Sequence, residues 1–369
     1  MTAPTSHESR ADQFRIVDLF AGPGGLDVAA RYLGVPVEVG IEWDKDACET
    51  RLAENLPTRH GDVRDFGPAD FPEANVLAGG PPCQTYTVAG SGSGRRALDD
   101  VIDLAKRMAA GEDVRARMDE LEDERTGLVL EPLRWALAAL AAEKPYEAIV
   151  LEQVPAVLPV WRVVQEVLEA KDYLVTEPTV LFTEEFGVPQ TRRRAILIAR
   201  WNGENARWGE AAELPEHTHQ RYRKGVDPEK RNAHDPWVAM GDVLDRPKPF
   251  EVVSNYGTGG DPKARGRRAS DLPAATVTGK ISRNRVVGAG STESRFTNAE
   301  AGQLQTFPAG YRWSGNGIPQ QIGNAIPPRL GIHVLTAALG LGKKARNEAV
   351  AALEADAITN PDVNPLLRP

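Results

Sequence analysis

Alternation of apolar runs with helical patterns over the first two hundred residues is the feature that most constrains the fold. Short apolar runs typical of buried strands alternate with segments whose apolar residues recur every three to four positions, as on one face of a helix. Because strands that alternate with helices form parallel pairs, the pattern predicts an α/β fold, a Rossmann-like domain with a mainly parallel, twisted sheet. The predicted strands cover 14–20, 37–41, 74–78, 148–151, 173–182 and 195–199, and the predicted helices cover 26–33, 47–55, 131–142 and 160–170.

Composition limits the class of protein. With 369 residues, of which 41% are apolar and 26% charged, the chain has the make-up of an ordinary globular protein with room for two domains. Two cysteines exclude a disulfide framework and no Cys/His cluster has zinc-ligand spacing, so we expect a reduced, cytoplasmic protein without a metal. No signal-peptide pattern occurs near the start, and no apolar stretch approaches the roughly 18 residues that suggest a membrane span.

The chain changes character after residue 200, where it becomes rich in Pro, Gly, His and Arg and loses long periodic stretches. Between His219 and Arg285 there are 14 Lys/Arg against 8 Asp/Glu, a local balance of +6 in a chain whose net charge is −8. A basic segment in an acidic chain is typical of a phosphate-facing surface, although a solvated loop has the same composition. Helical signals return with the capping-box pair Thr297 and Glu300. The predicted organisation begins with a disordered N-terminus (1–12) and a catalytic and cofactor-binding domain (13–200), in which exposed amphipathic helices are inserted at 95–125. A smaller irregular target-recognition domain follows (201–305), and the chain then returns to the first domain (306–342) with a Gly/Pro-rich loop at 320–328 and a helix at 328–341. The C-terminal tail (343–369) contains a short helix at 345–357.

One of the two cysteines lies in a segment with unusual backbone constraints. Cys83 follows a predicted strand and two prolines, and glycines stand on both sides of it. Proline fixes φ and removes a backbone donor, so this segment is neither a helix nor an ordinary strand. A thiol on a rigid loop after a strand is typical of a nucleophile, although a free cysteine is also a common small buried residue. The segment alone leaves both interpretations open.

The first predicted strand runs into a glycine-rich turn, Ala-Gly-Pro-Gly-Gly-Leu-Asp at 21–27. Its glycines permit a tight turn and the close approach of a nucleoside, but their spacing differs from the G-x-G-x-x-G of dinucleotide binders. Glu42, at the end of the second strand, is placed to accept hydrogen bonds from ribose hydroxyls, and Trp43 is placed to pack on an adenine. Asp62 has the right chemistry to accept from an adenine amino group. Each is compatible with an ordinary surface side chain, but together they predict an adenosyl pocket.

Six segments occur in the order typical of one enzyme family. With them the chain closely resembles the DNA (cytosine-5)-methyltransferase family from Phe14 to Leu341. The chain differs from the family at Gln153, where the family usually has Asn. The segments are Asp-Leu-Phe-Ala-Gly-Pro-Gly-Gly at 18–25, Pro-Pro-Cys-Gln at 81–84, Leu-Glu-Gln-Val at 151–154, Gln-Thr-Arg-Arg-Arg at 190–194, Leu-Gln-Thr-Phe-Pro at 304–308 and Gln-Ile-Gly-Asn-Ala-Ile-Pro-Pro at 321–328.

The resemblance implies methyl transfer from S-adenosyl-L-methionine to carbon 5 of a cytosine that is flipped out of double-stranded DNA. The Cys83 thiolate would add to carbon 6, which makes carbon 5 nucleophilic, and would leave after the carbon 5 proton is removed. Glu152 would contact N3 and the exocyclic amine, Arg194 would hold the carbonyl oxygen, and Arg192 would support the cysteine loop. We expect both arginines to stabilise the thiolate. A phosphate-contacting or solvated role for the basic run 192–194 is the alternative.

The same resemblance implies two sets of binding residues, and S-adenosyl-L-homocysteine as the product. We expect a monomer that acts either alone or beside a cognate restriction endonuclease. The cofactor set is Phe20, Gly22, Gly24, Gly25, Leu26, Glu42, Trp43, Asp62, Val63, Pro82 and Asn324, and the DNA set is Gln84, Tyr86, Arg265, Arg267 and Arg268.

Three alternatives remain open. A transfer-RNA cytosine-5 methyltransferase would use the same framework, although the length and basic composition of the second domain favour DNA. A nucleic-acid-binding protein without catalysis would not need the complete set of catalytic side chains. A nicotinamide-dependent oxidoreductase would account for the glycine turn but not for Cys83, Arg194 or the Pro-Pro segment.

Overall fold

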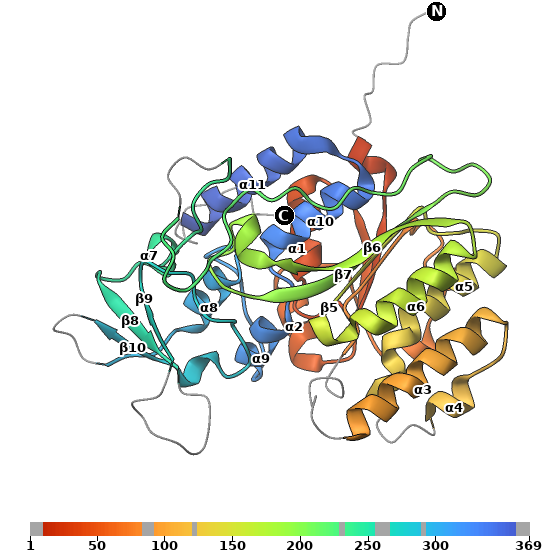
Figure 1. Ribbon diagram of the computed structural model, residues 1–369, viewed down its shortest axis with the longest axis horizontal. Coiled ribbons are helices and arrows are strands. Elements are labelled where there is room, and N and C mark those ends of the chain that lie inside the picture. The colour runs from red at the N-terminus through yellow and green to blue at the C-terminus, as the bar shows by residue number, and fades with distance from the viewer. Residues whose placement is uncertain are drawn as a thin grey trace, which may run out of the picture.

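The large domain is built on a seven-stranded sheet with the strand order β3-β2-β1-β4-β5-β7-β6 (Figure 1). The computed structural model describes residues 10–82, 92–119, 124–228, 233–254, 266–288 and 293–358. All neighbouring strands pair in parallel except β7, which runs antiparallel to both β5 and β6. The predicted α/β fold with a mainly parallel sheet is therefore confirmed. The strands are β1 (Ile16–Leu19), β2 (Val37–Glu42), β3 (Thr58–His60), β4 (Val76–Gly79), β5 (Ala148–Gln153), β6 (Tyr173–Phe182) and β7 (Arg193–Trp201).

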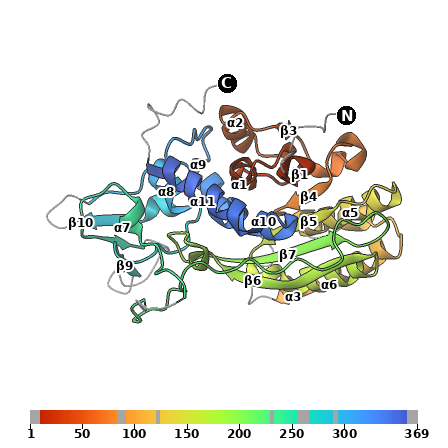
Figure 2. The ribbon, with the colours of Figure 1, turned by 90° about the horizontal axis from the view of Figure 1, so that it is seen from above.

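Helices cover both faces of this sheet (Figure 2). The core on one face is filled from α3, α5 and α6, and the core on the other face from α1, α10 and α11. Along β5 the side chains alternate between these two cores, with Leu151 in the first and Val150 in the second, as the two-residue period of a strand requires. The helices of this domain are α1 (Gly25–Leu33), α2 (Lys45–Ala53), α3 (Gly92–Ala109), α4 (Arg115–Asp119), α5 (Glu131–Ala141), α6 (Leu158–Glu169), α10 (Pro328–Leu339) and α11 (Gly342–Ile358).

The insertion after the cysteine segment is helical as predicted and forms α3 and α4, but these helices are not a solvated excursion. Val101, Leu104 and Ala105 of α3 are buried in the core that α5 and α6 also fill. Their spacing of three and four residues produces a continuous apolar stripe, and a stripe of that width packs against neighbouring elements. The expectation of exposed helices is wrong for this face, and the charged residues between the stripe positions remain on the outer face.

The smaller domain contains a three-stranded antiparallel sheet and long irregular connections. Its core also takes in Leu304 and Ile322 from α8 and α9, so the segments after residue 293 close this domain. The predicted capping box is confirmed, because the hydroxyl of Thr297 accepts from the backbone N–H of Glu300 and the Glu300 carboxylate accepts from the backbone N–H of Thr297. The elements are α7 (Met240–Val243), β8 (Phe250–Val253), β9 (Arg267–Ala269), β10 (Arg285–Gly288), α8 (Asn298–Leu304) and α9 (Ile318–Asn324).

The predicted Gly/Pro-rich loop at 320–328 is helical in its first part, where α9 forms. Ile322 is fully buried, and the Gln321 side chain accepts from Thr50 and donates to the main-chain oxygen of Ser314. Gly323 is required within this helix because an added Cβ would overlap the backbone at 278–279. Long-range contacts thus stabilise a helix in a sequence whose local preferences predict a loop.

The segment predicted as a C-terminal tail is folded over most of its length. Helix α11 packs against α1 and α10, with Ala349 and Leu353 buried, and Lys343 and Arg346 pair with Glu216. Residues 1–9 and 359–369 lie outside the described part of the chain. Within the described ranges, no helix combines the length and the apolar character needed to cross a membrane.

Candidate active site

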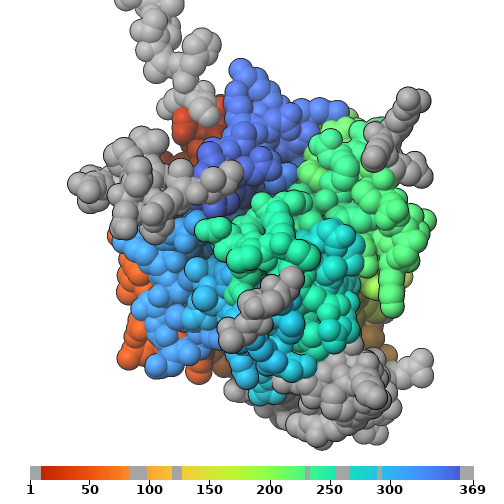
Figure 3. All heavy atoms as spheres, turned by 90° about the vertical axis from the view of Figure 1, so that its left-hand side faces the viewer, coloured from red at the N-terminus to blue at the C-terminus, as the bar shows by residue number. Residues whose placement is uncertain are grey.

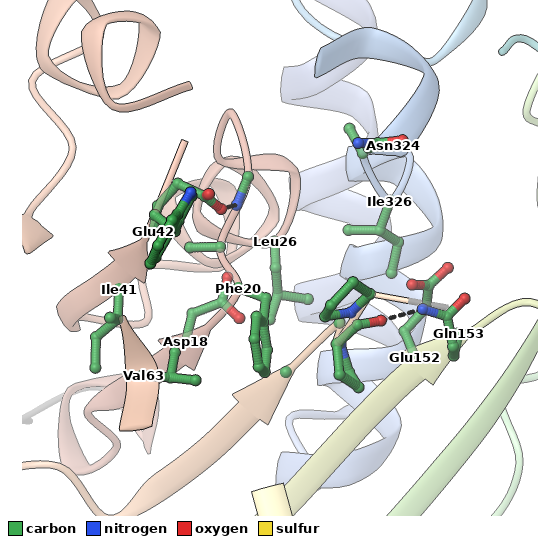
Figure 4. A pocket seen from close by; sticks show the side chains of 18 of the residues that line it. Asp18, Phe20, Leu26, Ile41, Glu42, Val63, Glu152, Gln153, Asn324 and Ile326 are labelled. Carbon is green, nitrogen blue, oxygen red and sulfur yellow. Dashed lines mark hydrogen bonds between the residues drawn. The ribbon is translucent and has the colours of Figure 1, made fainter. Parts of the chain in front are cut away.

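A pocket of about 550 Å³ opens at the carboxyl ends of β1, β2, β4 and β5 (Figure 4). Parallel strands present their carboxyl ends at one edge of a sheet, which is where α/β proteins bind ligands. Because β7 is antiparallel, its first residues lie at the same edge and bring Arg194 into the pocket wall. The end of α9 and the start of the loop after it close the remaining side with residues 323–326.

The glycine turn forms one wall and is fixed from two directions. Gly22 adopts a φ of 55° and donates its backbone N–H to the Glu42 carboxylate at 2.8 Å. Gly25 lies so close to the main-chain oxygen of Ile326 that an added Cβ would overlap that atom. Gly24, with a φ of 99°, packs against the Leu56 side chain and does not line the pocket. Backbone geometry, rather than ligand contact, thus explains the glycine at position 24.

Glu42 holds a defined orientation at the end of β2. One carboxylate oxygen accepts from Gly22 and the other from the backbone N–H of Asp44 at 2.6 Å. Burial raises the pKa of Glu42, and these two main-chain hydrogen bonds oppose the rise. Trp43 beside it lines the pocket while 69% of its surface is exposed, so its ring offers an uncovered apolar face.

Asp62 lies in the same wall and pairs with Arg64, a residue that the sequence did not single out. The two groups approach to 2.6 Å, and the backbone N–H of Arg64 also donates to the carboxylate. Burial raises the pKa of Asp62, but the hydrogen bonds from Arg64 outweigh burial and hold it below its usual value. The carboxylate therefore stays ionised and presents acceptor oxygens at the pocket.

Glu152 and Arg194 form an ion pair on the opposite side of the pocket, with Nε and Oε1 2.5 Å apart. Their side chains are only 14% and 11% exposed. Figure 4 shows Glu152 and Gln153 across the pocket from Glu42. The Gln153 amide donates to the main-chain oxygen of Pro81, and its own oxygen accepts from the N–H of Val154. Gln153 therefore joins the end of β5 to the Pro-Pro segment that precedes Cys83.

Arg192 does not share the pocket with Arg194. It is buried, and its guanidinium donates to the main-chain oxygens of Val277, Gly323 and Ala325 at 2.8–3.1 Å. Burial lowers its pKa well below the usual arginine value. Residues two positions apart point to the same face only if both belong to a regular strand. Because β7 begins at 193, Arg192 lies before the strand and this rule does not apply to Arg192 and Arg194. The sequence spacing thus predicted a closer association of the two arginines than the fold provides.

Of the predicted cofactor residues, all but Gly24 line the pocket. Cys83, Gln84, Tyr86 and Arg265 lie outside the described residues, although Pro82 lines the pocket immediately before Cys83. The sequence missed several lining residues, of which Asp18 had a detectable signal as an acidic residue within an apolar strand. Burial and the nearby Asp27 carboxylate raise the pKa of Asp18 well above its usual value. The other missed residues are Ala21, Ile41, Asp44, Gly61, Arg64, Gly79, Gly80, Pro81, Leu128, Val150, Gln153, Val154, Gly323, Ala325 and Ile326.

The described arginines of the predicted DNA set lie away from this pocket, in β9 of the smaller domain. Figure 3 shows the face of the molecule that this domain forms, in teal and cyan beside the blue C-terminal segments. Arg267 is exposed and pairs with Glu251, whereas Arg268 donates to the main-chain oxygen of Pro273 at 2.8 Å. Among the described residues, no group of three or more His, Cys, Asp or Glu side chains has an arrangement that could hold a metal ion.

Comparisons with known proteins cover most of the chain. The family model described as C-5 cytosine-specific DNA methylase matches residues 14–105 and 116–339. The Type II methyltransferase M.SsoII of Shigella sonnei is 25% identical over 338 residues, covering 86% of this chain and 80% of the relative. The Type II methyltransferase M.PspPI of Psychrobacter sp. (strain TA137) is 27% identical over 361 residues, covering 87% of this chain and 78% of the relative.

Two solved structures share the fold at low sequence identity. The S. pombe Dnmt2 methyltransferase has a TM-score of 0.58 and 16% identity, covering 89% of this chain and 98% of that chain. The Entamoeba histolytica methyltransferase EhMeth has a TM-score of 0.58 and 14% identity, covering 90% of this chain and all of that chain.

Proposed function

Because the chain belongs to the C-5 cytosine-specific DNA methylase family, we propose that it methylates carbon 5 of cytosine within a specific double-stranded DNA sequence. The observation that carries this proposal is the single pocket in which an adenosyl-type wall, with Glu42 and Asp62, faces the Glu152–Arg194 pair. The methyl donor is S-adenosylmethionine, which supplies an electrophilic methyl group when bound.

The adenosyl-type wall fits this donor. Each carboxylate oxygen of Glu42 accepts one backbone hydrogen bond and retains a lone pair for a ribose hydroxyl. The exposed ring of Trp43 can stack on a purine, and the ionised Asp62 can accept from its amino group. Together these side chains would bind and orient the adenosine.

Cys83 is the proposed nucleophile, and Pro82, which immediately precedes it in the sequence, lines the pocket. Its thiolate adds to carbon 6 of the ring, which raises the electron density at carbon 5. Glu152 contacts N3 and the exocyclic amine, and Arg194 holds the carbonyl oxygen as charge develops there. Once the methyl group is on carbon 5, removal of the carbon 5 proton lets the thiolate leave by elimination. A stacked base cannot reach these groups, so the cytosine must be flipped out.

Replacement of Cys83 by Ala tests this role. We expect methyl transfer to be abolished while S-adenosylmethionine binding, measured by calorimetry, is retained. Cys48 provides a matched control: its thiol lies in α2, donates to the main-chain oxygen of Glu42 and has a pKa raised by burial to about 11, which makes it a poor nucleophile. Cys48→Ala should therefore remain active.

DNA that carries 5-fluorocytosine at the methylated site should trap the adduct, because fluorine cannot leave in place of the proton. A stable protein–DNA complex with the wild type and with Cys48→Ala, but not with Cys83→Ala, is expected. Turnover by Cys83→Ala would contradict the proposed mechanism.

We also propose the division of labour between the domains. Residues 13–200 and 306–342 carry catalysis, and residues 201–305, with their three-stranded sheet, carry target recognition. The relatives named Type II methyltransferases favour a DNA substrate over transfer RNA, and they favour a cognate restriction endonuclease as a partner in the same cell. Methylation assays with duplex DNA and with transfer RNA, followed by sequencing of the modified cytosines, distinguish the two substrates.

A further inference from the structure

A second hollow, of about 240 Å³, lies between the start of β7 and the smaller domain. Four arginines line it: Arg193 from β7, Arg221 from the irregular segment after β7, Arg268 from β9, and Arg192. The guanidinium of Arg192 already donates to three main-chain oxygens, so the other three are the candidates for an anion. We propose that this hollow, the arginine hollow, binds a backbone phosphate of the DNA strand that carries the target cytosine. The inference rests on the proposed function and adds a phosphate site to it.

The guanidinium groups are held by aromatic rings rather than by acids. The Cζ atom of Arg221 is 3.3 Å from the ring centroid of Phe182, and that of Arg193 is 5.4 Å from the same centroid. The Cζ atom of Arg268 is 4.8 Å from the ring centroid of Tyr222. A guanidinium that stacks on a ring through its face keeps the N–H groups at its edge available for phosphate oxygens. In Arg268 this applies to Nε and Nη2, because Nη1 donates to the main-chain oxygens of Pro273 and Ala274.

The arginine hollow has an excess of positive charge. Within the described part of the chain, no carboxylate lies within ion-pair distance of Arg193, Arg221 or Arg268. Glu184 also lines the hollow, but burial raises its pKa to about 7, so it carries only part of a negative charge near neutral pH. Like charges gathered in one hollow repel one another, and an anion that accepts from all three would relieve this repulsion.

The position of the arginine hollow relative to the pocket indicates which anion this is. Arg193 and Arg194 are neighbours on β7, so their side chains point to opposite faces of the strand. Arg194 lines the pocket proposed for the cytosine and Arg193 lines the hollow. A DNA strand carries one phosphate per about 3.4 Å of helix axis, so a strand whose base occupies the pocket has phosphates close to it on either side.

The experiment compares salt dependence of binding between two charge-matched double variants. Arg193→Gln/Arg221→Gln removes the two arginines that contact Phe182. Arg162→Gln/Lys171→Gln removes the same charge from exposed positions in and after α6. Binding of a short DNA duplex is measured by fluorescence anisotropy at several salt concentrations, which does not require turnover. Wild-type methylation of the duplex is assayed separately, so a failure of the proposed function is visible on its own.

We expect the arginine-hollow variant to bind DNA about 10-fold or more weakly at low salt, and its slope of log K against log salt to become shallower by about 1 for each phosphate lost. S-adenosylmethionine affinity and the choice of target sequence should stay unchanged. The control variant should keep the wild-type slope. A further variant, Arg193→Lys/Arg221→Lys, keeps the charge and should retain most of the slope.

Two results would overturn the proposal. One is a wild-type salt slope in the folded arginine-hollow variant, with folding checked by circular dichroism. The other is a changed target sequence with an unchanged salt slope, which would assign these arginines to base reading instead of phosphate binding.

Discussion

Replacing Arg51 by Met should strongly destabilise the large domain. Arg51 of α2 and Asp27 of α1 form a bidentate ion pair, at 2.9 and 2.7 Å, with both side chains completely buried. The guanidinium also donates to the main-chain oxygen of Pro57 and to the Thr58 hydroxyl. It lies beside the glycine turn, 3.6 Å from the position that a Cβ on Gly24 would occupy. One side chain therefore joins α1, α2 and the chain leading into β3.

The magnitude follows from what the substitution leaves behind. Methionine fills much of the same volume, but Asp27 would keep a buried carboxylate without a partner. Breaking a buried ion pair from one side costs about 3–5 kcal/mol, whereas removal of both charges is often close to neutral. Arg51→Met should therefore lose about 3–5 kcal/mol, and Arg51→Met/Asp27→Leu should recover most of that loss.

Urea unfolding followed by far-UV circular dichroism measures both variants and gives the coupling energy of the pair from the double-mutant cycle. Arg162→Met is the control, because its pair with Glu177 spans 3.7 Å on the exposed surface and should contribute nothing measurable. A single variant as stable as the wild type would refute the argument. A double variant no more stable than Arg51→Met would refute it equally, since the cost would then not come from the stranded charge.

Three further predictions concern the pocket and its surroundings. Gly25→Ala should weaken S-adenosylmethionine binding at least 10-fold by calorimetry, because its Cβ would displace the backbone at Ile326, whereas Gly67→Ala, with open space around it, should bind normally. Gln153→Leu should slow methyl transfer about 5- to 100-fold, because it removes one to two hydrogen bonds that join the end of β5 to the Pro-Pro segment. S-adenosylmethionine affinity should be retained. An unchanged kcat would contradict a role of Gln153 in positioning that segment. Burial raises the pKa of Glu184 to about 7 in the folded protein, against 4.5 in the unfolded chain. The contribution of Glu184 to the free energy of unfolding is therefore most favourable below pH 4.5, where the carboxyl group is protonated in both states, and it is lost as the pH rises through 7. Glu184→Gln should thus stabilise the protein at pH 8 by up to about 3 kcal/mol and change little at pH 4.5, and an equal gain at both pH values in urea unfolding would count against this.

Local sequence patterns predicted the elements whose burial follows a simple period. The central strands β4 and β5 are nearly continuous apolar runs because helices cover both faces, and such runs are visible without any tertiary information. The pocket residues Phe20, Gly22, Gly25, Leu26, Glu42 and Trp43 were also predictable, since they lie at or after the carboxyl ends of predicted strands, which must lie at one edge. Asp62 and Val63 were predicted from side-chain chemistry and the family resemblance instead, because the strand before them was not predicted. The polar strand β3, Thr58–His60, was missed because it is a short edge strand without an apolar run.

Features that depend on contacts between distant segments were not predictable. Helix α9 forms because Gln321 and Ile322 find partners in α2 and the smaller domain, and the local sequence indicates only a loop. The burial of Arg192 depends on three carbonyl groups that lie 85 to 133 positions further along the chain. The arginine hollow likewise joins residues from β6, β7 and β9, so no single segment of the sequence carries its signal.

These long-range bonds make the start of β7 the mechanical link between the two domains. Gln190 binds the main chain at Leu304 and at Val277, and Arg192 binds the main chain at Val277 and at 323–325. All of these bonds are buried, so each broken one would leave a polar group without water to replace its partner. The smaller domain and the loop after α9 are therefore held in a fixed relation to the strand that begins at 193. The first two residues of that strand, Arg193 and Arg194, line the arginine hollow and the pocket. If the smaller domain contacts DNA as proposed, we therefore expect that contact to position Arg194 through a rigid connection rather than through a hinge.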